Sequence, residues 1–203
     1  MAAGARLSGF VEVPYRFLNP EINANANGLA DINASFKVAL VDSRDLAATF
    51  QFRTYIPTGD AARGLGTNHV SLKPALLAYR RLGERLGLEG ELRYLIPIGG
   101  TDFAGDLFRY GVGLSYDLPP ARPLHLAPVA ELVGWTVLSG KESVVSPAGV
   151  ATVDSAAGDT IVNLKLGMRV KGCGWDLYAG YGWPLTGDRW YDDIVRLEFR
   201  LWF

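Results

Sequence analysis

The sequence predicts an all-β fold: a transmembrane antiparallel up-and-down β-barrel of about ten strands, in a single domain over residues 1–203. Three observations predict it. Apolar and polar residues alternate with a period of two, the alternation recurs in segments of about ten residues, and short links between segments take turns with long ones. About ten residues is the length that a tilted strand needs to cross a bilayer.

Composition narrows the class of protein. The chain is 49% apolar and 20% charged, whereas soluble domains carry roughly 25% charged residues. No stretch approaches the roughly 18 consecutive apolar residues that a membrane-spanning helix requires. The 20 basic and 21 acidic residues leave no basic excess, so we expect no nucleic-acid partner.

The sequence also argues against disulfides, metals and cofactors. Cys173 is the only cysteine, which excludes an intramolecular disulfide, and the two histidines offer little for a zinc cluster. The start, MAAGARLSGF, lacks the charged segment, apolar core and cleavage site of an export signal. We therefore expect Met1 to begin a chain from which the signal peptide is absent.

The alternation defines the expected strands. In the last segment, for example, Val195, Leu197 and Phe199 alternate with Arg196, Glu198 and Arg200. The pattern is weakest over residues 69–80 and 124–138. The expected strands are residues 5–17, 29–41, 46–56, 69–80, 86–96, 108–117, 124–138, 159–170, 175–184 and 191–203.

The links between these segments alternate in length as they do in outer-membrane barrels. The long links are residues 18–28, 57–68, 97–107, 139–158 and 185–189, and the short ones are residues 42–45, 82–85, 118–123 and 171–174. Three strands end alike, in YIPTGD, YLIPIGG and GWPLTGD, where proline and glycine favour a turn. Ten strands then place both termini on the periplasmic side.

A soluble barrel with an apolar interior is the structural rival, because alternation alone does not say which face is inside. The segments exceed the usual strand length of about five or six residues. Aromatic residues lie toward the ends of the apolar stripes, as they do at membrane interfaces; they are Tyr15, Tyr94, Tyr110, Tyr116, Trp175 and Trp183. We therefore favour the outer membrane of a Gram-negative bacterium, with the apolar face toward lipid.

The last strand carries two further expectations. It ends at Phe203 and resembles the terminal signal that the barrel-assembly machinery recognises, so we expect that machinery as a partner. Because an unpaired backbone group in hydrocarbon costs several kcal/mol, we also expect residues 5–17 to pair with residues 191–203.

The charged register points into a narrow bore, since ten strands enclose little more than side chains. The lumen-lining candidates are Arg16, Lys37, Arg53, Lys73, Glu91, Arg93, Arg109, Glu131, Lys165, Arg169, Arg196 and Glu198. The same register contains Glu12, Asp31, Glu89, Asp117, Asp176 and Arg200. These charges form either a salt-bridge network that fills the barrel or, chiefly through Arg53, Lys73, Arg93 and Arg109, a path for a small polar or anionic solute.

One segment resembles a known family. Residues 28–83, with GLADINASFK and YIPTGDAARGLGTNHVSLKPALLAYRRLG, resemble a family of outer-membrane proteins named for a meta-pathway of phenol degradation, and the later GWDLYAGYGWPLT also fits. Together the matching segments cover about half of the chain. The resemblance implies a barrel that helps small, often aromatic, compounds cross the outer membrane, and it assigns no catalytic residues.

Two functions remain open. The first is a narrow outer-membrane channel for passive uptake of small molecules; the second is a non-conducting structural or recognition barrel with a salt-bridged, filled lumen. The longest external loop, residues 139–158, is composed of small residues and offers few anchors for a protein partner. We expect no enzyme. Asp60, His69 and Ser71 are the candidates for catalysis, but one histidine beside a strand end is more often a solvated polar residue than a general base, and the sequence shows no third group that would orient it.

Overall fold

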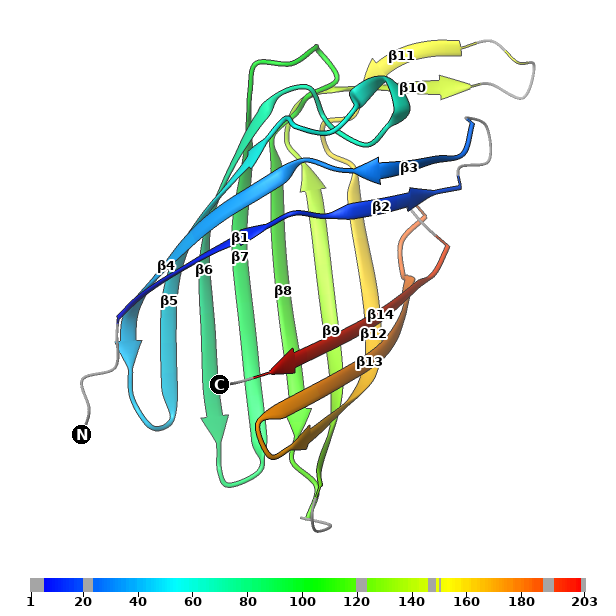
Figure 1. Cartoon of the computed structure of the whole chain (residues 1–203). Helices are drawn as coiled ribbons and strands as arrows, with labels where there is room; N and C mark the ends of the chain where they lie inside the picture. Colours follow the sequence, from blue (N-terminus) through cyan, green and yellow to red (C-terminus); the bar gives the residue numbers. More distant parts are fainter. Residues whose placement is uncertain are drawn as a thin grey trace.

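The computed structural model describes residues 6–19, 24–119, 124–145, 149, 151–187 and 192–201. Ten strands form one antiparallel sheet in which neighbours in space are also neighbours along the chain (Figure 1). The strands of this sheet are β1 (Leu7–Glu12), β4 (Ile32–Asp42), β5 (Leu46–Ile56), β6 (Val70–Leu82), β7 (Leu86–Ile98), β8 (Leu107–Tyr116), β9 (His125–Val137), β12 (Thr160–Gly172), β13 (Trp175–Pro184) and β14 (Ile194–Leu201).

The expected all-β, antiparallel, up-and-down architecture is confirmed. Strand β5 and strand β13 begin and end where the alternation predicts, and the two weakly patterned segments form β6 and β9. The short links after β6 and β12 each contain a glycine in a left-handed conformation, with φ 72° at Gly83 and 78° at Gly174. In the described part of the chain, no helix is long and apolar enough to cross a membrane.

The first expected strand is not continuous. Strand β1 ends at Glu12, two residues before Pro14, which has no N–H to donate to a ladder. The chain then forms β2 (Tyr15–Leu18), which pairs with β3 (Ala26–Leu29) in a separate two-stranded sheet. The prediction of one strand over residues 5–17 is therefore wrong, and Arg16 lies outside the ten-stranded sheet.

Two of the long links contain structure of their own. The link after β9, expected as the external loop 139–158, contains the hairpin of β10 (Lys141–Val145) and β11 (Ala151–Ser155). The link after β5 contains a 3-10 helix, η1 (Ala61–Arg63), which the Asp60 side chain caps by accepting a hydrogen bond from the Ala62 N–H at 3.1 Å.

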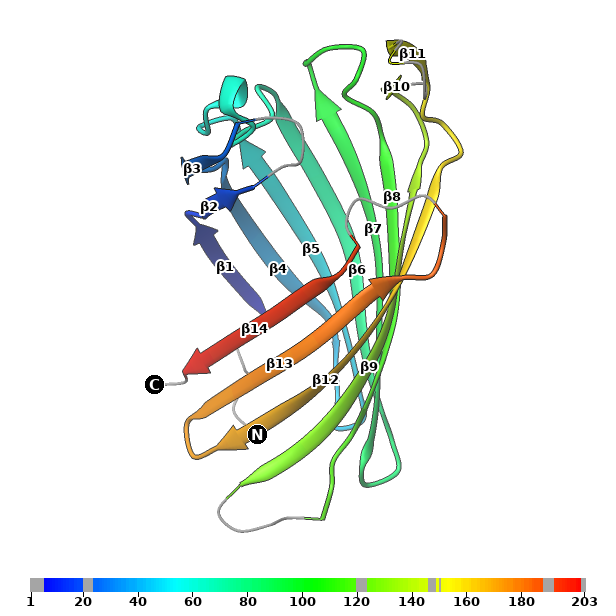
Figure 2. The same ribbon diagram turned by 90° about the vertical axis from the view of Figure 1, so that its right-hand side faces the viewer.

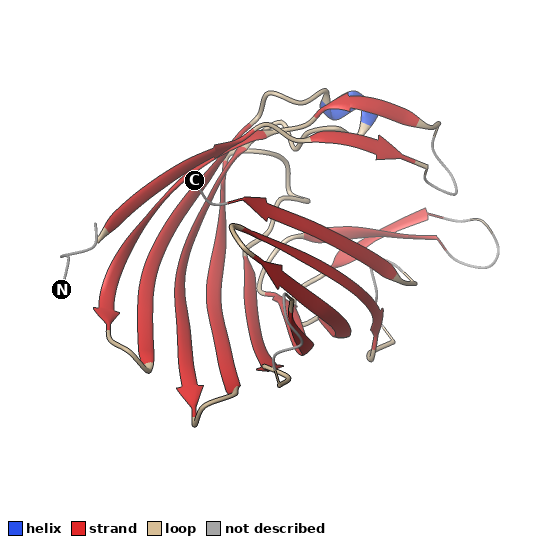
Figure 3. Cartoon of the chain, turned by 60° about the horizontal axis from the view of Figure 1, so that its bottom comes forward, coloured by secondary structure: helices blue, strands red, loops and turns tan. Residues whose placement is uncertain are grey.

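The ten-stranded sheet curls round on itself (Figures 2 and 3). Side chains of β4 and β14 line the same interior cavity. The sheet does not close, because β1 and β14 are its two edges and are not paired with each other. The expected pairing of residues 5–17 with residues 191–203 is therefore wrong for the described residues; positions 5, 191, 202 and 203 lie outside them. Strand β1 has six residues, so it offers few ladder hydrogen bonds to a second neighbour.

The two faces of the sheet have the polarity opposite to that of a soluble protein. Large apolar side chains are exposed on the outer face, with Leu92 52%, Phe199 61% and Leu197 73% exposed. Polar side chains on the inner face are buried, including Gln51 at 2% and Asp176 at 2%. Since charged and polar residues in soluble domains lie mostly outside, this sheet is inverted, as the sequence predicts.

Candidate functional site

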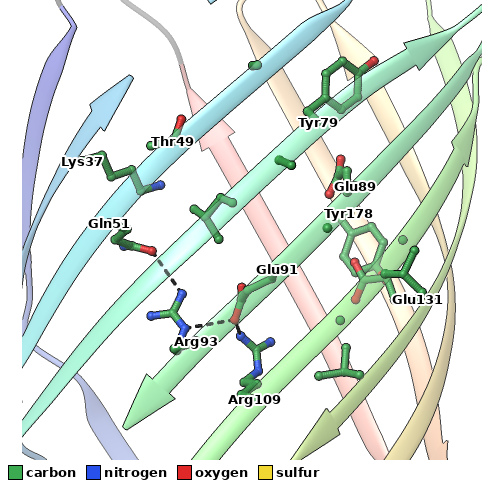
Figure 4. Close-up of a pocket in the computed structure, with 18 of the residues that line it drawn as sticks. Lys37, Thr49, Gln51, Tyr79, Glu89, Glu91, Arg93, Arg109, Glu131 and Tyr178 are labelled. Carbon is green, nitrogen blue, oxygen red and sulfur yellow. Dashed lines mark hydrogen bonds and ion pairs between the residues drawn. The ribbon is translucent and has the colours of Figure 1, made fainter. Parts of the chain in front are cut away.

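The candidate site is a partly open cavity of about 560 Å³ on the inner face of the curled sheet, lined by side chains from β4 to β14 (Figure 4). Cations outnumber acids in its lining. The cations are Lys37, Arg53, Arg93, Arg109, Arg169, Arg196 and Arg200, and the acids are Glu89, Glu91 and Glu131. A cavity of this size and charge suits a small polar or anionic molecule.

Glu91 joins two arginines at the centre of the cavity. Arg93 on β7 lies directly opposite Arg109 on β8, so their like charges are placed side by side. Glu91 is two residues before Arg93 and therefore on the same face of β7. It accepts a hydrogen bond from Arg93 Nε at 3.0 Å and pairs with Arg109 Nη1 as well (Figure 4).

The same network extends across the wall to β4. Arg93 Nη2 donates to Gln51 Oε1 at 3.1 Å, and Gln51 Nε2 donates to Ser35 Oγ at 3.0 Å. Between them on β6, Ala75 is the residue opposite both Gln51 and Arg93. Because alanine is short, the two longer side chains meet above it and connect strands that are not neighbours.

The other side of the cavity has its own ion pairs. Arg169 Nη1 lies 3.1 Å from Asp176 Oδ2, and the Asp176 side chain is 3% exposed. The ring of Tyr178, 1% exposed, lies between Arg169 and Arg196, with centroid distances of 5.4 and 5.8 Å. On β14, Glu198 pairs with Arg196 at 2.7 Å and also with Arg200. These contacts fix β12, β13 and β14 relative to one another.

A third group of cations, on β4, β5 and β6, has aromatic neighbours. Lys37 Nζ lies 5.9 Å from the centroid of the Phe10 ring, and the Arg53 guanidinium lies 4.8 Å from the same ring. Lys73 Nζ lies 3.8 Å from the centroid of the Tyr55 ring. Arg53 and Lys73 are directly opposite each other in the β5–β6 ladder. We call Lys37, Arg53 and Lys73 the β4–β6 cluster.

The structure places the lumen candidates in three groups. Lining the cavity are Lys37, Arg53, Glu91, Arg93, Arg109, Glu131, Arg169 and Arg196. Lys73, Lys165 and Glu198 are beside these residues on the ten-stranded sheet, through Arg53, Glu131 and Arg196 respectively. Arg16, on β2, is exposed and is not part of the ten-stranded sheet.

Gln51 and Tyr178 line the cavity but were not among the candidates. Both fall in the register of the charged residues, so the alternation contained the signal. Because neither side chain is charged at neutral pH, the expectation of a charged lumen did not include them. Arg200 and Glu89, which the register contains, also line the cavity.

At the end of the sheet where η1 lies, Asp31, just before β4, forms hydrogen bonds with the loop between β5 and β6. Its carboxylate accepts hydrogen bonds from the Gly59 N–H at 3.0 Å and from the N–H and hydroxyl of Thr67, both at 2.8 Å. Burial raises the pKa of Asp31, but the hydrogen bonds from Gly59 and Thr67, with the charge of Arg16, outweigh burial and lower the pKa below its ordinary value. The ionised carboxylate therefore stabilises this loop.

The residues considered for catalysis serve local structure. Asp60 caps η1, Ser71 is buried on β6, and His69 Nδ1 lies 2.8 Å from the carbonyl oxygen of Thr67. In the part of the chain that the structure describes, no group of three or more His, Cys, Asp or Glu residues could hold a metal ion.

No protein-family model matches the chain, and no curated protein matches its sequence. The resemblance of residues 28–83 to the phenol-degradation family therefore stays a prediction carried by the quoted segments.

Proposed function

We propose that this chain is an outer-membrane protein of a Gram-negative bacterium and forms a narrow channel for the passive entry of small molecules. The inverted polarity of the sheet carries the proposal. An outer face with Leu92, Leu197 and Phe199 more than half exposed is costly in water and favourable in hydrocarbon. A charged inner face has the opposite preference, so the sheet is suited to lipid outside and water inside.

Strand length supports the same proposal. The strands from β4 to β13 in the large sheet have 10 to 13 residues, and about 9 to 11 residues cross a bilayer at the usual tilt. Soluble strands usually have about five or six residues. The excess length is explained if the strands span hydrocarbon.

A sheet in lipid also needs its edges covered, because bare backbone groups there cost several kcal/mol each. Our proposal includes closure of the barrel by β1 and β14 in the bilayer. A register that places Glu12 opposite Arg196 keeps both charges inside and sets opposite charges side by side. The same register places Val11 opposite Leu197 on the outer face, where both are already exposed.

The channel is favoured over a filled barrel by the 560 Å³ cavity and its excess of cations. A specific observation favours the rival, a non-conducting barrel held by salt bridges: the Glu91 network crosses the interior from β4 to β8. Both functions use the same fold, so conductance distinguishes them.

Single-channel recording in planar bilayers tests the proposal. The folded protein should give discrete conductance steps. Gly113 faces the cavity, where a Cβ would meet Glu131 and Glu89 carbons at an ordinary 3.6 Å, so G113W should lower the conductance by partial blocking. In the matched control, G90W, the new side chain lies on the outer face of the neighbouring strand, opposite Val112, and should leave the conductance unchanged.

The absence of conductance from protein that migrates as a folded, heat-modifiable band would favour the filled barrel. Equal effects of G113W and G90W would contradict the assignment of inner and outer faces.

A further inference from the structure

We propose that the β4–β6 cluster binds the carboxylate of a small organic anion, with the rings of Phe10 and Tyr55 contacting its apolar body. This inference rests on the proposed channel and names the class of solute that the channel would take. The sequence-based hypothesis named Arg53, Lys73, Arg93 and Arg109 as the solute path; this inference keeps Arg53 and Lys73, adds Lys37 and leaves out Arg93 and Arg109.

Most acids of the interior are already engaged elsewhere, and Glu89, a further acid of the cavity wall, lies on β7. Glu91 pairs with Arg93 and Arg109, Asp176 pairs with Arg169, and Glu198 pairs with Arg196 and Arg200. Glu131 lies directly opposite Lys165 in the β9–β12 ladder. The negative charge of the cavity wall is therefore concentrated on the β7–β14 side.

The β4–β6 cluster has little of this compensation. Arg53 is directly opposite Lys73 in the β5–β6 ladder, and it lies with Lys37 beside the Phe10 ring. Among the described residues, the one acid in a salt bridge with the cluster is Glu12, 3.8 Å from Arg53, and the Glu12 side chain is 52% exposed. A positive region whose one paired acid is half-exposed remains at one side of the cavity.

Such a region attracts anions for a simple electrostatic reason. Like charges held together in a partly enclosed space repel one another, and a bound anion relieves that repulsion. Lysine and arginine donate charge-assisted hydrogen bonds, which are stronger than neutral ones, to a carboxylate. The arginine adds a planar donor pair that matches the two carboxylate oxygens.

The aromatic neighbours indicate what the rest of the anion should be. The Phe10 ring lies beside Lys37 and Arg53, and the Tyr55 ring lies beside Lys73, while the Tyr55 hydroxyl accepts from Arg53 Nη1 at 3.2 Å. Aromatic faces next to the cations offer apolar contact area within hydrogen-bond reach of a carboxylate. A carboxylate carried on a small apolar or aromatic body fits both features, beside the cavity that Lys37 and Arg53 line.

Benzoate binding to the full chain, folded in detergent, tests the inference by calorimetry. We expect K37Q/K73Q to weaken benzoate binding by about tenfold or more, because each lysine removed takes a charge-assisted contact with it. Benzyl alcohol, which keeps the ring and lacks the charge, should bind far more weakly. The matched control is K141Q, in the β10–β11 hairpin, where Lys141 already pairs with Asp102 at 2.7 Å and removal should change nothing.

A conservative variant distinguishes loss of the binding charges from loss of the fold. K37R/K73R keeps the charge and should keep benzoate affinity within a few-fold of the wild type. Benzoate affinity that is absent in the wild-type protein, or unchanged in K37Q/K73Q, would overturn the inference.

Conductance separates this inference from the proposed function. In a KCl gradient, the reversal potential of the wild-type channel should indicate anion selectivity, and K37Q/K73Q should shift it toward zero. Conductance without anion selectivity would overturn the inference and leave the channel standing. Benzoate binding that K37Q/K73Q weakens, in a protein that never conducts, would support the site and remove the channel.

Discussion

Replacing Glu91 by glutamine tests how strongly the interior ion pairs hold the sheet together. The change removes the one carboxylate that serves both Arg93 and Arg109. It leaves two guanidinium groups directly opposite each other on β7 and β8. A neutral amide accepts hydrogen bonds less strongly than a carboxylate and does not offset the repulsion.

The expected magnitude follows from burial. The side chains of Glu91, Arg93 and Arg109 are 22%, 12% and 30% exposed, so the group is shielded from water only in part. Each hydrogen bond to a charged group contributes about 1.5–3 kcal/mol, and breaking a buried pair costs about 3–5 kcal/mol. After a discount for solvent screening, we expect the free energy of unfolding to fall by about 2–4 kcal/mol.

Urea unfolding in detergent micelles, followed by circular dichroism and by heat-modifiable migration, measures this loss. The control E142Q changes an exposed carboxylate on β10 and should stay within about 0.5 kcal/mol of the wild type. The double variant E91Q/R109Q removes the repulsion and should recover part of the loss. A stability of E91Q equal to that of E142Q would refute the assignment of a structural role to this network.

Three further predictions address the loop, the outer face and the seam. The pKa of Asp31 is lower in the folded state than in the unfolded state, so its carboxylate stabilises the fold above the unfolded value of about 3.9 and loses that effect as pH falls through the lowered folded value. The free energy of unfolding of D31N should therefore be lower than that of the wild type, and this difference should shrink as the pH is lowered through that window. A difference that does not change with pH would contradict this role. L92R places a charge on the outer face, which costs about 2–4 kcal/mol near the bilayer midplane, and should therefore lower the folding yield into vesicles. A yield equal to that of the wild type would contradict lipid contact. In a C173S background, V11C/L197C should form a disulfide in vesicles if β1 and β14 pair with Glu12 opposite Arg196. The control is V11C/F199C, in which the second cysteine is shifted by two residues. Stronger cross-linking in the control would refute the register.

The sequence was sufficient for the architecture because a period of two is a direct record of which face each side chain takes. Leu92 outside and Arg93 inside follow from their positions alone, and β5 and β13 have the expected ends because proline and glycine punctuate them. The break before Pro14 was also visible in principle, since proline interrupts a ladder at that position. The alternation on both sides of Pro14 concealed it.

The contacts inside the cavity depend on information that no single strand carries. The meeting of Gln51 and Arg93 requires the registers of both flanking ladders and a small residue, Ala75, between them. Which acid pairs with which cation depends on side-chain reach across several strands, so the concentration of the acids on one side of the wall emerged only in three dimensions. The β10–β11 hairpin was missed because its small residues give weak alternation.

Lipid contact at the outer face is tested most directly by nitroxide spin labels placed one at a time along β8, in a C173S background in vesicles. Labels at Val112 and Leu114 should collide mainly with oxygen, which concentrates in hydrocarbon, whereas labels at Gly111 and Gly113 should collide mainly with a water-soluble nickel complex. Collision with the nickel complex at Val112 and Leu114, or no alternation along the strand, would contradict a membrane-spanning sheet.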